Sequence, residues 1–122
     1  MQHWGQHLIL NIASCDKELV TNKEYLRVFV QTLVKKIDMK AFGEPIIEHF
    51  GKEDLAISGY SVVQLIETSA ITGHFVDCNG DAYLDIFSCK EFDVDVAIQY
   101  IKESFHPEHI DHQVLFRQAF NK

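Results

Sequence analysis

Three side chains that can do chemistry lie on two strand-like segments of this chain. Ser69 and His74 fall within residues 66–74, and Cys89 follows Ser69 by 20 residues. A short turn at Asn79 and Gly80 joins the two segments, so a hydroxyl, an imidazole and a thiol could converge at one end of a hairpin. This combination favours self-processing or acyl chemistry, although such residues on strands more often serve packing or the surface.

Five further blocks of sequence surround these residues, at 5–9, 15–16, 59–61, 84–89 and 97–105. In this order and spacing, from about residue 3 to 115, the chain resembles the small bacterial and archaeal S-adenosylmethionine decarboxylases. Those proteins are pyruvoyl enzymes, made as a proenzyme that cuts itself before a serine. The resemblance implies a carboxy-lyase of polyamine and spermidine biosynthesis that matures by cleavage between Thr68 and Ser69.

The same resemblance implies a role for each reactive residue. Ser69 becomes the pyruvoyl group, and His74 accepts the Cα proton of Ser69 during maturation. Ser61 assists the rearrangement, and Cys89 returns a proton to the substrate carbon after decarboxylation. An imidazole that is neutral near pH 7 can accept a proton and a thiol can deliver one, so the residue types suit these tasks. The pyruvoyl group is the expected cofactor, and no metal is required.

Two departures from the family pattern concern the substrate. Thr68 stands where the family usually has Glu, and Glu67 lies one position earlier, so that on a strand it would point to the other side. The family's Trp-Pro-Glu run, whose acid contacts the ribose, is replaced by Phe75-Val76-Asp77-Cys78, in which only Asp77 could substitute. Phe50 is the candidate for stacking on adenine. Phe50, Glu67 and Asp77 are therefore the predicted substrate-binding residues.

Three functions remain open at this point. The first is decarboxylation of S-adenosylmethionine, and the second is the same chemistry on ornithine or arginine, suggested by the missing Trp-Pro-Glu run. The third is an unprocessed, non-catalytic relative that acts as a binding or regulatory subunit, suggested by Thr68 at the cleavage position. A net charge of -7 suits a cationic substrate but does not separate the first two.

Composition excludes several other classes of protein. The 11 Lys and Arg residues are scattered through an acidic chain, which argues against nucleic acid as a partner. Hydrophobic residues make up 47% of the 122 residues without a run long enough to span a bilayer, so no membrane association is predicted. No basic region precedes an apolar stretch at the start of the chain, which favours the cytoplasm.

His106, His109 and His112 superficially resemble a metal site, because their spacing would place them on one face of a helix. Pro107 and the strand-like sequence that follows argue against that helix, and a strand would divide the three side chains between two faces. A solvated loop is the favoured interpretation. No metal site is predicted.

The predicted elements alternate between strands and two helices. They are a strand over 6–13, a helix over 22–38, a strand over 41–50 interrupted by Gly43 and Pro45, strands over 61–68 and 71–76 with a bend at Ser69 and Ala70, a strand over 82–88, a helix from Asp93 to His106, and a strand over 110–116. This order predicts an α+β fold: a two-layer sandwich in which two helices cover one face of an antiparallel sheet. Residues 1–122 are expected to form a single domain.

Apolar residues occupy both alternating positions in the strands predicted over 61–68 and 82–88. Because the helices can cover only one face of the sheet, the other face needs a partner layer. We therefore predict a homodimer of proenzyme protomers, with the Ser69 site near the boundary between them.

Overall fold

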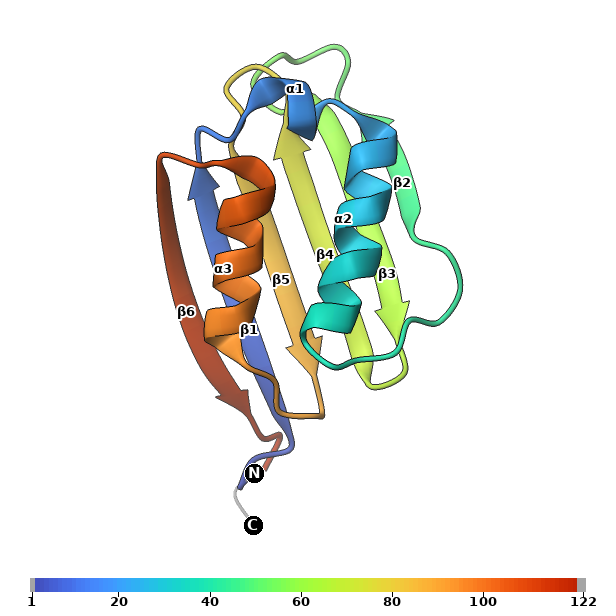
Figure 1. The fold of residues 1–122 in the computed structure, drawn as a ribbon, viewed down its shortest axis with the longest axis vertical. Coiled ribbons are helices and arrows are strands. Elements are labelled where there is room, and N and C mark those ends of the chain that lie inside the picture. The colour runs from blue at the N-terminus through green and yellow to red at the C-terminus, as the bar shows by residue number, and fades with distance from the viewer. Residues whose placement is uncertain (1, 121–122) are drawn as a thin grey trace.

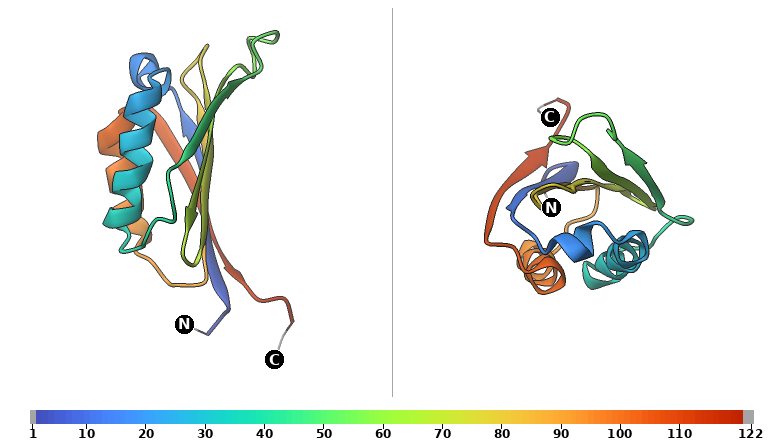
Figure 2. Two further views of the ribbon diagram at one scale, coloured as in Figure 1. Left: turned by 90° about the vertical axis from the view of Figure 1, so that its right-hand side faces the viewer. Right: turned by 90° about the horizontal axis from the view of Figure 1, so that it is seen from above.

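An antiparallel sheet forms one layer of the molecule, and helices α2 and α3 lie side by side against one of its faces (Figure 1, Figure 2). The computed structural model describes residues 2–120. Its elements in chain order are β1 (Gly5–Ala13), α1 (Lys17–Val20), α2 (Lys23–Lys36), β2 (Ile46–Phe50), β3 (Gly59–Ile66), β4 (Ser69–Val76), β5 (Ala82–Ser88), α3 (Val94–Phe105) and β6 (His109–Arg117). The strands follow the spatial order β2-β3-β4-β5-β1-β6. The predicted α+β sandwich is confirmed.

Local signals explain both long helices. Asn22 caps α2 by accepting a hydrogen bond from the Tyr25 N–H, and Asp93 caps α3 in the same way at Val96. After α3, His106 adopts a left-handed backbone with φ of 50°, and a proline follows that cannot continue the helix. The helices predicted over 22–38 and from Asp93 are therefore confirmed, apart from small differences at their ends.

The hydrophobic core fills the space between the two helices and the sheet. Phe105 of α3 lies 4.5 Å from Phe29 of α2 and 5.4 Å from Phe75 of β4, measured between ring centroids. All three side chains are at most 3% exposed. Burying a phenylalanine is worth about 1.5–3 kcal/mol relative to leaving it in water. This cluster therefore anchors both helices on β4, the strand that begins at Ser69.

Two features in the first half of the chain differ from the prediction. The short helix α1 was not predicted, and its first turn is held by Asp16, whose side chain accepts the Glu18 N–H. The strand predicted over 41–50 is shorter, because only β2 pairs continuously and Ala41 makes one isolated bridge to Ile66. Pro45 immediately precedes β2, which is an edge strand, as expected for a residue without an N–H to donate.

The turn between β3 and β4 also differs from the prediction. Ile66 pairs directly with Ser69, so Glu67 and Thr68 form a tight two-residue hairpin turn. No bend occurs at Ser69 and Ala70, which both belong to β4. Ser69 is therefore the first residue of a strand that is hydrogen-bonded on both sides, by β3 and by β5.

The face of the sheet opposite the helices is uncovered in this single chain (Figure 2). It carries exposed apolar side chains, among them Val63 at 37%, Leu65 at 51% and Tyr83 at 49% exposure. Both faces thus hold apolar residues, which is the pattern on which the homodimer prediction rests. The dimer itself stays a prediction.

Candidate active site at the start of β4

The peptide bond between Thr68 and Ser69 lies where the β3–β4 turn meets the end of β5 (Figure 1). The carbonyl oxygen of Thr68 accepts a hydrogen bond of 3.1 Å from the backbone N–H of Cys89. Ser69 pairs with Ser88, the residue before Cys89. The predicted cleavage site and the predicted proton donor are therefore brought together, and the contact polarises the Thr68 carbonyl.

Side-chain contacts hold Thr68 in place. Its hydroxyl forms a 2.9 Å hydrogen bond with the hydroxyl of Ser88, which is fully buried and also accepts the Lys90 N–H at 2.9 Å. The sulfur of Met39 lies 3.6 Å from the Thr68 hydroxyl. Within residues 2–120 the hydroxyl of Ser69 makes no hydrogen bond, so the candidate nucleophile is unengaged while the preceding residue is fixed.

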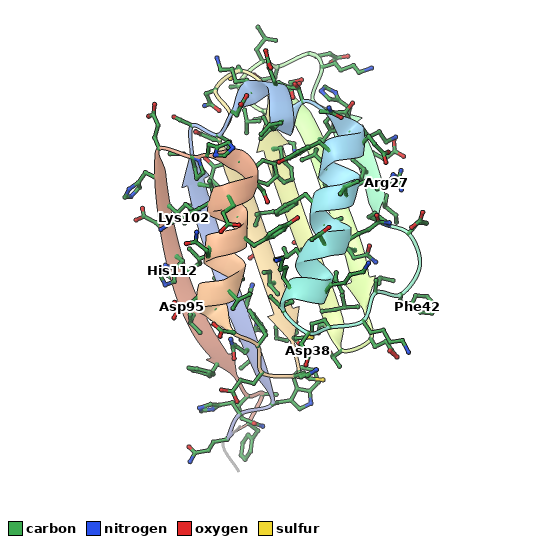
Figure 3. The ribbon with its side chains drawn as sticks, viewed as in Figure 1. Arg27, Asp38, Phe42, Asp95, Lys102 and His112 are labelled. Atoms are coloured by element: carbon green, nitrogen blue, oxygen red, sulfur yellow. The ribbon has the colours of Figure 1, made fainter. Side chains whose placement is uncertain are left out.

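A cavity of about 410 Å³ opens beside Thr68. Its walls are Asp38, Met39, Lys40, Glu67, Thr68 and Lys90. Figure 3 shows Asp38 at the end of α2 that lies nearest the β3–β4 turn. The Lys90 ammonium donates a hydrogen bond of 2.6 Å to the backbone carbonyl of Asp38. Glu67 is in the turn rather than on a strand, 4.0 Å from the Lys40 ammonium. Of the predicted substrate-binding residues, Glu67 is the one that the structure places beside Ser69.

Ser61 and His74 form a second polar cluster on β3 and β4. They face each other across the two strands, and the Ser61 hydroxyl is 2.9 Å from Nδ1 of His74. The other ring nitrogen, Nε2, lies 2.8 Å from the backbone carbonyl of Ile57. The imidazole is therefore held at both nitrogens, in an arrangement that can accept a proton at one of them.

These two clusters lie apart within one chain. His74 is five residues beyond Ser69 on β4, which corresponds to about 17 Å along an extended strand. An odd spacing also puts the two side chains on opposite faces, with Ser69 on the face of the buried Ile71 and His74 on the uncovered face. The prediction that Ser69, His74 and Cys89 converge is therefore wrong for His74 within a single protomer.

Phe50 and Asp77 belong to the His74 end of the sheet. Phe50 closes β2 opposite Gly59 and is 58% exposed. Asp77 follows β4, and its carboxylate is 2.7 Å from Nε2 of His49. The predicted substrate-binding residues are thus divided, because Glu67 lies at the Ser69 end and the other two lie at the opposite end.

An aromatic cavity near the Ser69 end was not predicted. It has a volume of about 450 Å³ and is lined by Trp4, Phe87, Arg117, Gln118, Ala119 and Phe120. Phe87 pairs with Ala70, the residue after Ser69. The Phe87 ring lies 5.9 Å from the Trp4 ring and 5.2 Å from the Arg117 guanidinium. In the sequence, Trp4 beside the block at residues 5–9 was a signal that could have pointed to this cavity. No motif marks residues 117–120, which form its other wall.

A model of the S-adenosylmethionine decarboxylase family matches residues 6–118. The chain belongs to this family. Among curated relatives, the S-adenosylmethionine decarboxylase proenzyme of Bacillus velezensis is 27% identical over 109 residues, which cover 88% of this chain and 81% of that protein. The proenzyme of Caldicellulosiruptor saccharolyticus is 28% identical, and the match covers 100% of this chain and 94% of that protein.

A solved structure supports the fold independently. The crystal structure of the adenosylmethionine decarboxylase from Aquifex aeolicus matches with a TM-score of 0.81 at 22% sequence identity, covering 100% of this chain and 97% of that one. At this identity the likeness speaks for the fold alone. The six-stranded sheet and its helix layer are therefore the S-adenosylmethionine decarboxylase fold, and the match extends over both polar clusters.

Other reactive side chains do not join this site. His106 caps α3, while His109 and His112 lie on β6 at an odd spacing that divides them between two faces. Among residues 2–120, no group of three or more His, Cys, Asp or Glu side chains is arranged to hold a metal ion. None of the helices in this part of the chain is long and apolar enough to cross a membrane.

Proposed function

We propose that this chain is a pyruvoyl-dependent S-adenosylmethionine decarboxylase of polyamine biosynthesis, matured by self-cleavage between Thr68 and Ser69. Family membership and the proenzyme names of its relatives support the reaction class. The observation that carries the proposal is the 3.1 Å hydrogen bond from the Cys89 N–H to the Thr68 carbonyl. It stabilises negative charge at the oxygen where charge develops during cleavage.

The first step is transfer of the Thr68 acyl group from nitrogen to oxygen. The hydroxyl oxygen of Ser69 attacks the Thr68 carbonyl carbon, and the C–N bond breaks to leave an ester and a free amine. The hydroxyl proton ends on that amine. A preorganised N–H donor aimed at a developing oxyanion typically lowers the activation free energy by about 3 kcal/mol. The backbone of Cys89 supplies such a donor.

The second step needs a base at the Cα hydrogen of Ser69. Loss of that proton expels the Thr68 carboxylate and leaves dehydroalanine, which reacts with water to give the pyruvoyl group and ammonia. His74 has the right chemistry but lies about 17 Å along the strand from Ser69 in its own chain. A second copy must therefore bring its His74 to this Ser69.

A homodimer can meet this requirement through the uncovered sheet face, because the base acts on the backbone Cα hydrogen of Ser69 and not on its hydroxyl, which points to the helix face. A two-fold axis that runs across the strands places the His74 end of one protomer over the Ser69 end of the other. Each of the two resulting sites would then combine Thr68, Ser69 and Cys89 of one protomer with the Ser61–His74 pair of its partner. The same symmetry would also reunite Phe50 and Asp77 with Glu67.

For turnover, a pyruvoyl group supplies an electron sink for the charge left when carbon dioxide departs. Cys89 lies next to Ser88, the residue paired with Ser69, where its thiol can return a proton to the substrate carbon. The aromatic cavity around Trp4 and Phe87 offers ring surfaces for a purine. Ornithine has no planar group to stack there, so this cavity favours S-adenosylmethionine over ornithine.

Intact-mass spectrometry of the purified chain tests the proposal directly. Wild type should yield a fragment of residues 69–122 whose N-terminus is blocked as a pyruvoyl group. Ser69→Ala should stay at full length, because it lacks the attacking hydroxyl. A fragment that begins with an open Ser69 amine would indicate simple hydrolysis and would exclude pyruvoyl formation.

One observation favours a different function. Thr68 is fixed by the buried Ser88 hydroxyl where the family has a glutamate, which would suit a turn that stays uncut. In that case the chain would be a non-catalytic binding or regulatory subunit. The same mass spectrum decides, because a wild-type chain of full length and normal fold would support the subunit and contradict the decarboxylase.

A further inference from the structure

The hydrogen bonds of His74 determine which of its ring nitrogens is basic. A backbone carbonyl can only accept, so the 2.8 Å contact with Ile57 requires a proton on Nε2. In the neutral ring, Nδ1 then carries the lone pair and accepts from the Ser61 hydroxyl at 2.9 Å. The Ser61 hydroxyl, the His74 ring and the Ile57 carbonyl therefore form a chain of hydrogen bonds. The carbonyl selects the tautomer and stabilises the charged ring once Nδ1 takes a proton.

This carbonyl belongs to an ordered loop between β2 and β3, residues 51–58. Asp54 organises the loop, because its backbone carbonyl accepts the N–H groups of Ile57 at 3.1 Å and Ser58 at 3.0 Å. Its side chain also accepts the Ala56 N–H at 3.0 Å. These bonds set the internal shape of the loop but do not attach it to the strand that carries His74.

Asp77 makes that attachment. Its backbone N–H donates to the Ser58 carbonyl at 2.9 Å, and its carboxylate accepts from the Ser58 hydroxyl at 3.4 Å. The same carboxylate oxygen is 2.7 Å from Nε2 of His49, on the strand that leads into the loop. Figure 1 shows that the loop and the β4–β5 turn both lie at the upper end of the sheet. Both ends of the loop are thereby tied to the end of β4.

We infer that Asp77 is a positioning residue, which holds the 51–58 loop so that the Ile57 carbonyl keeps Nδ1 of His74 as the basic nitrogen. Ser58 is 6% exposed and next to Ile57, so a contact at Ser58 constrains the neighbouring carbonyl. The effect of Asp77 on self-cleavage rests on the proposed function. Its effect on the His74 tautomer does not, and this makes the two separable.

Two-bond nitrogen–proton NMR of the histidine rings measures the tautomer directly. The reference is the Ser69→Ala chain, which cannot be cut. At a pH where His74 is neutral, we expect the Nε2–H form alone. Adding Asp77→Ala should produce a mixture of both tautomers, whereas Asp77→Asn, which keeps an oxygen acceptor for Ser58 and His49, should restore the single form. An Nδ1–H form in the reference chain would overturn the inference.

Self-cleavage provides the second readout, in chains that keep Ser69. Asp77→Ala should slow cleavage about tenfold, equivalent to roughly 1.4 kcal/mol, and Asp77→Asn should recover most of the rate. Glu53→Ala is the matched control, because Glu53 is an exposed acidic residue of the same loop. If Asp77→Ala does not fold, His49→Ala removes the 2.7 Å partner and should act in the same direction. An unchanged tautomer in a folded Asp77→Ala or His49→Ala chain would refute the role of Asp77.

Discussion

The backbone N–H of Cys89 and the backbone carbonyl of Thr68 are joined by a 3.1 Å hydrogen bond between the end of β5 and the β3–β4 turn. Cys89 therefore has two separable parts in the proposed reaction. Its N–H acts on the peptide bond that is cut, and its thiol acts later on the substrate. Replacing the side chain leaves the backbone donor in place.

Cys89→Ala should accordingly separate maturation from turnover. We expect the variant to be cut at least partly between Thr68 and Ser69, because the N–H is retained, and to release carbon dioxide from S-adenosylmethionine poorly. Loss of a general acid typically lowers kcat by about 10²- to 10⁴-fold. Mass spectrometry measures the cut fraction, and labelled carbon dioxide measures turnover. A normal kcat would remove the Cys89 thiol from the mechanism.

Substrate choice should follow the aromatic cavity. We expect kcat/KM for S-adenosylmethionine to exceed that for ornithine and for arginine by at least about tenfold, or roughly 1.4 kcal/mol. Trp4→Ala should raise KM for S-adenosylmethionine, because a ring surface is lost. Phe42→Ala is the matched control, since Phe42 is also exposed but projects from the opposite edge of the sheet (Figure 3). The reverse order of substrates would identify a basic amino acid decarboxylase.

Local signals were sufficient for most of the fold. Asn22 and Asp93 are helix caps recognisable from sequence, and the strand predicted over 82–88 coincides with β5. The β3–β4 turn was misplaced because neither Glu67 nor Thr68 is a typical turn residue. Its position follows from the register of Ile66 with Ser69, which neighbouring strands impose and which no local pattern encodes.

The site was predictable where the order of hairpins, rather than closeness along the chain, brings its residues together. Thr68 and Cys89 meet because consecutive hairpins bring them to one end of the sheet. His74 was misplaced because a spacing of five residues was treated as proximity, although an extended strand carries it about 17 Å away. The contact of Trp4 with Gln118 joins residues 114 positions apart, and a sequence pattern cannot show it.

Burial of Cys15 should make stability fall at high pH. Its side chain is 4% exposed, and this burial, together with the nearby Asp81 carboxylate, raises the pKa of the Cys15 thiol to about 12. The folded chain therefore keeps the proton while the unfolded chain loses it. The free energy of unfolding should fall by about 1.4 kcal/mol per pH unit between about pH 9 and 12, and be insensitive to this group at lower pH.

Urea unfolding of wild type and Cys15→Ala at several alkaline pH values isolates this contribution. Burial and the neighbouring Tyr100 and Asp16 also raise the pKa of Tyr25, but that group is present in both chains and cancels in the difference. The difference in free energy of unfolding between the two chains should change with pH only above about pH 9. A difference that is constant up to pH 11 would show that the thiol ionises freely in the folded state.

The shared site predicts that two inactive chains can complement each other. Expressed alone, His74→Ala should stall uncut or as the ester, and Ser69→Ala should stay whole. In a mixed dimer, the Ser69 of the His74→Ala chain meets the intact His74 of its partner. With random pairing, about half of the His74→Ala chains should then be cut, and no Ser69→Ala chain should be. Absence of any cut chain in the mixture, or a light-scattering mass of 14.1 kDa for fully active protein, would contradict a site built from two protomers.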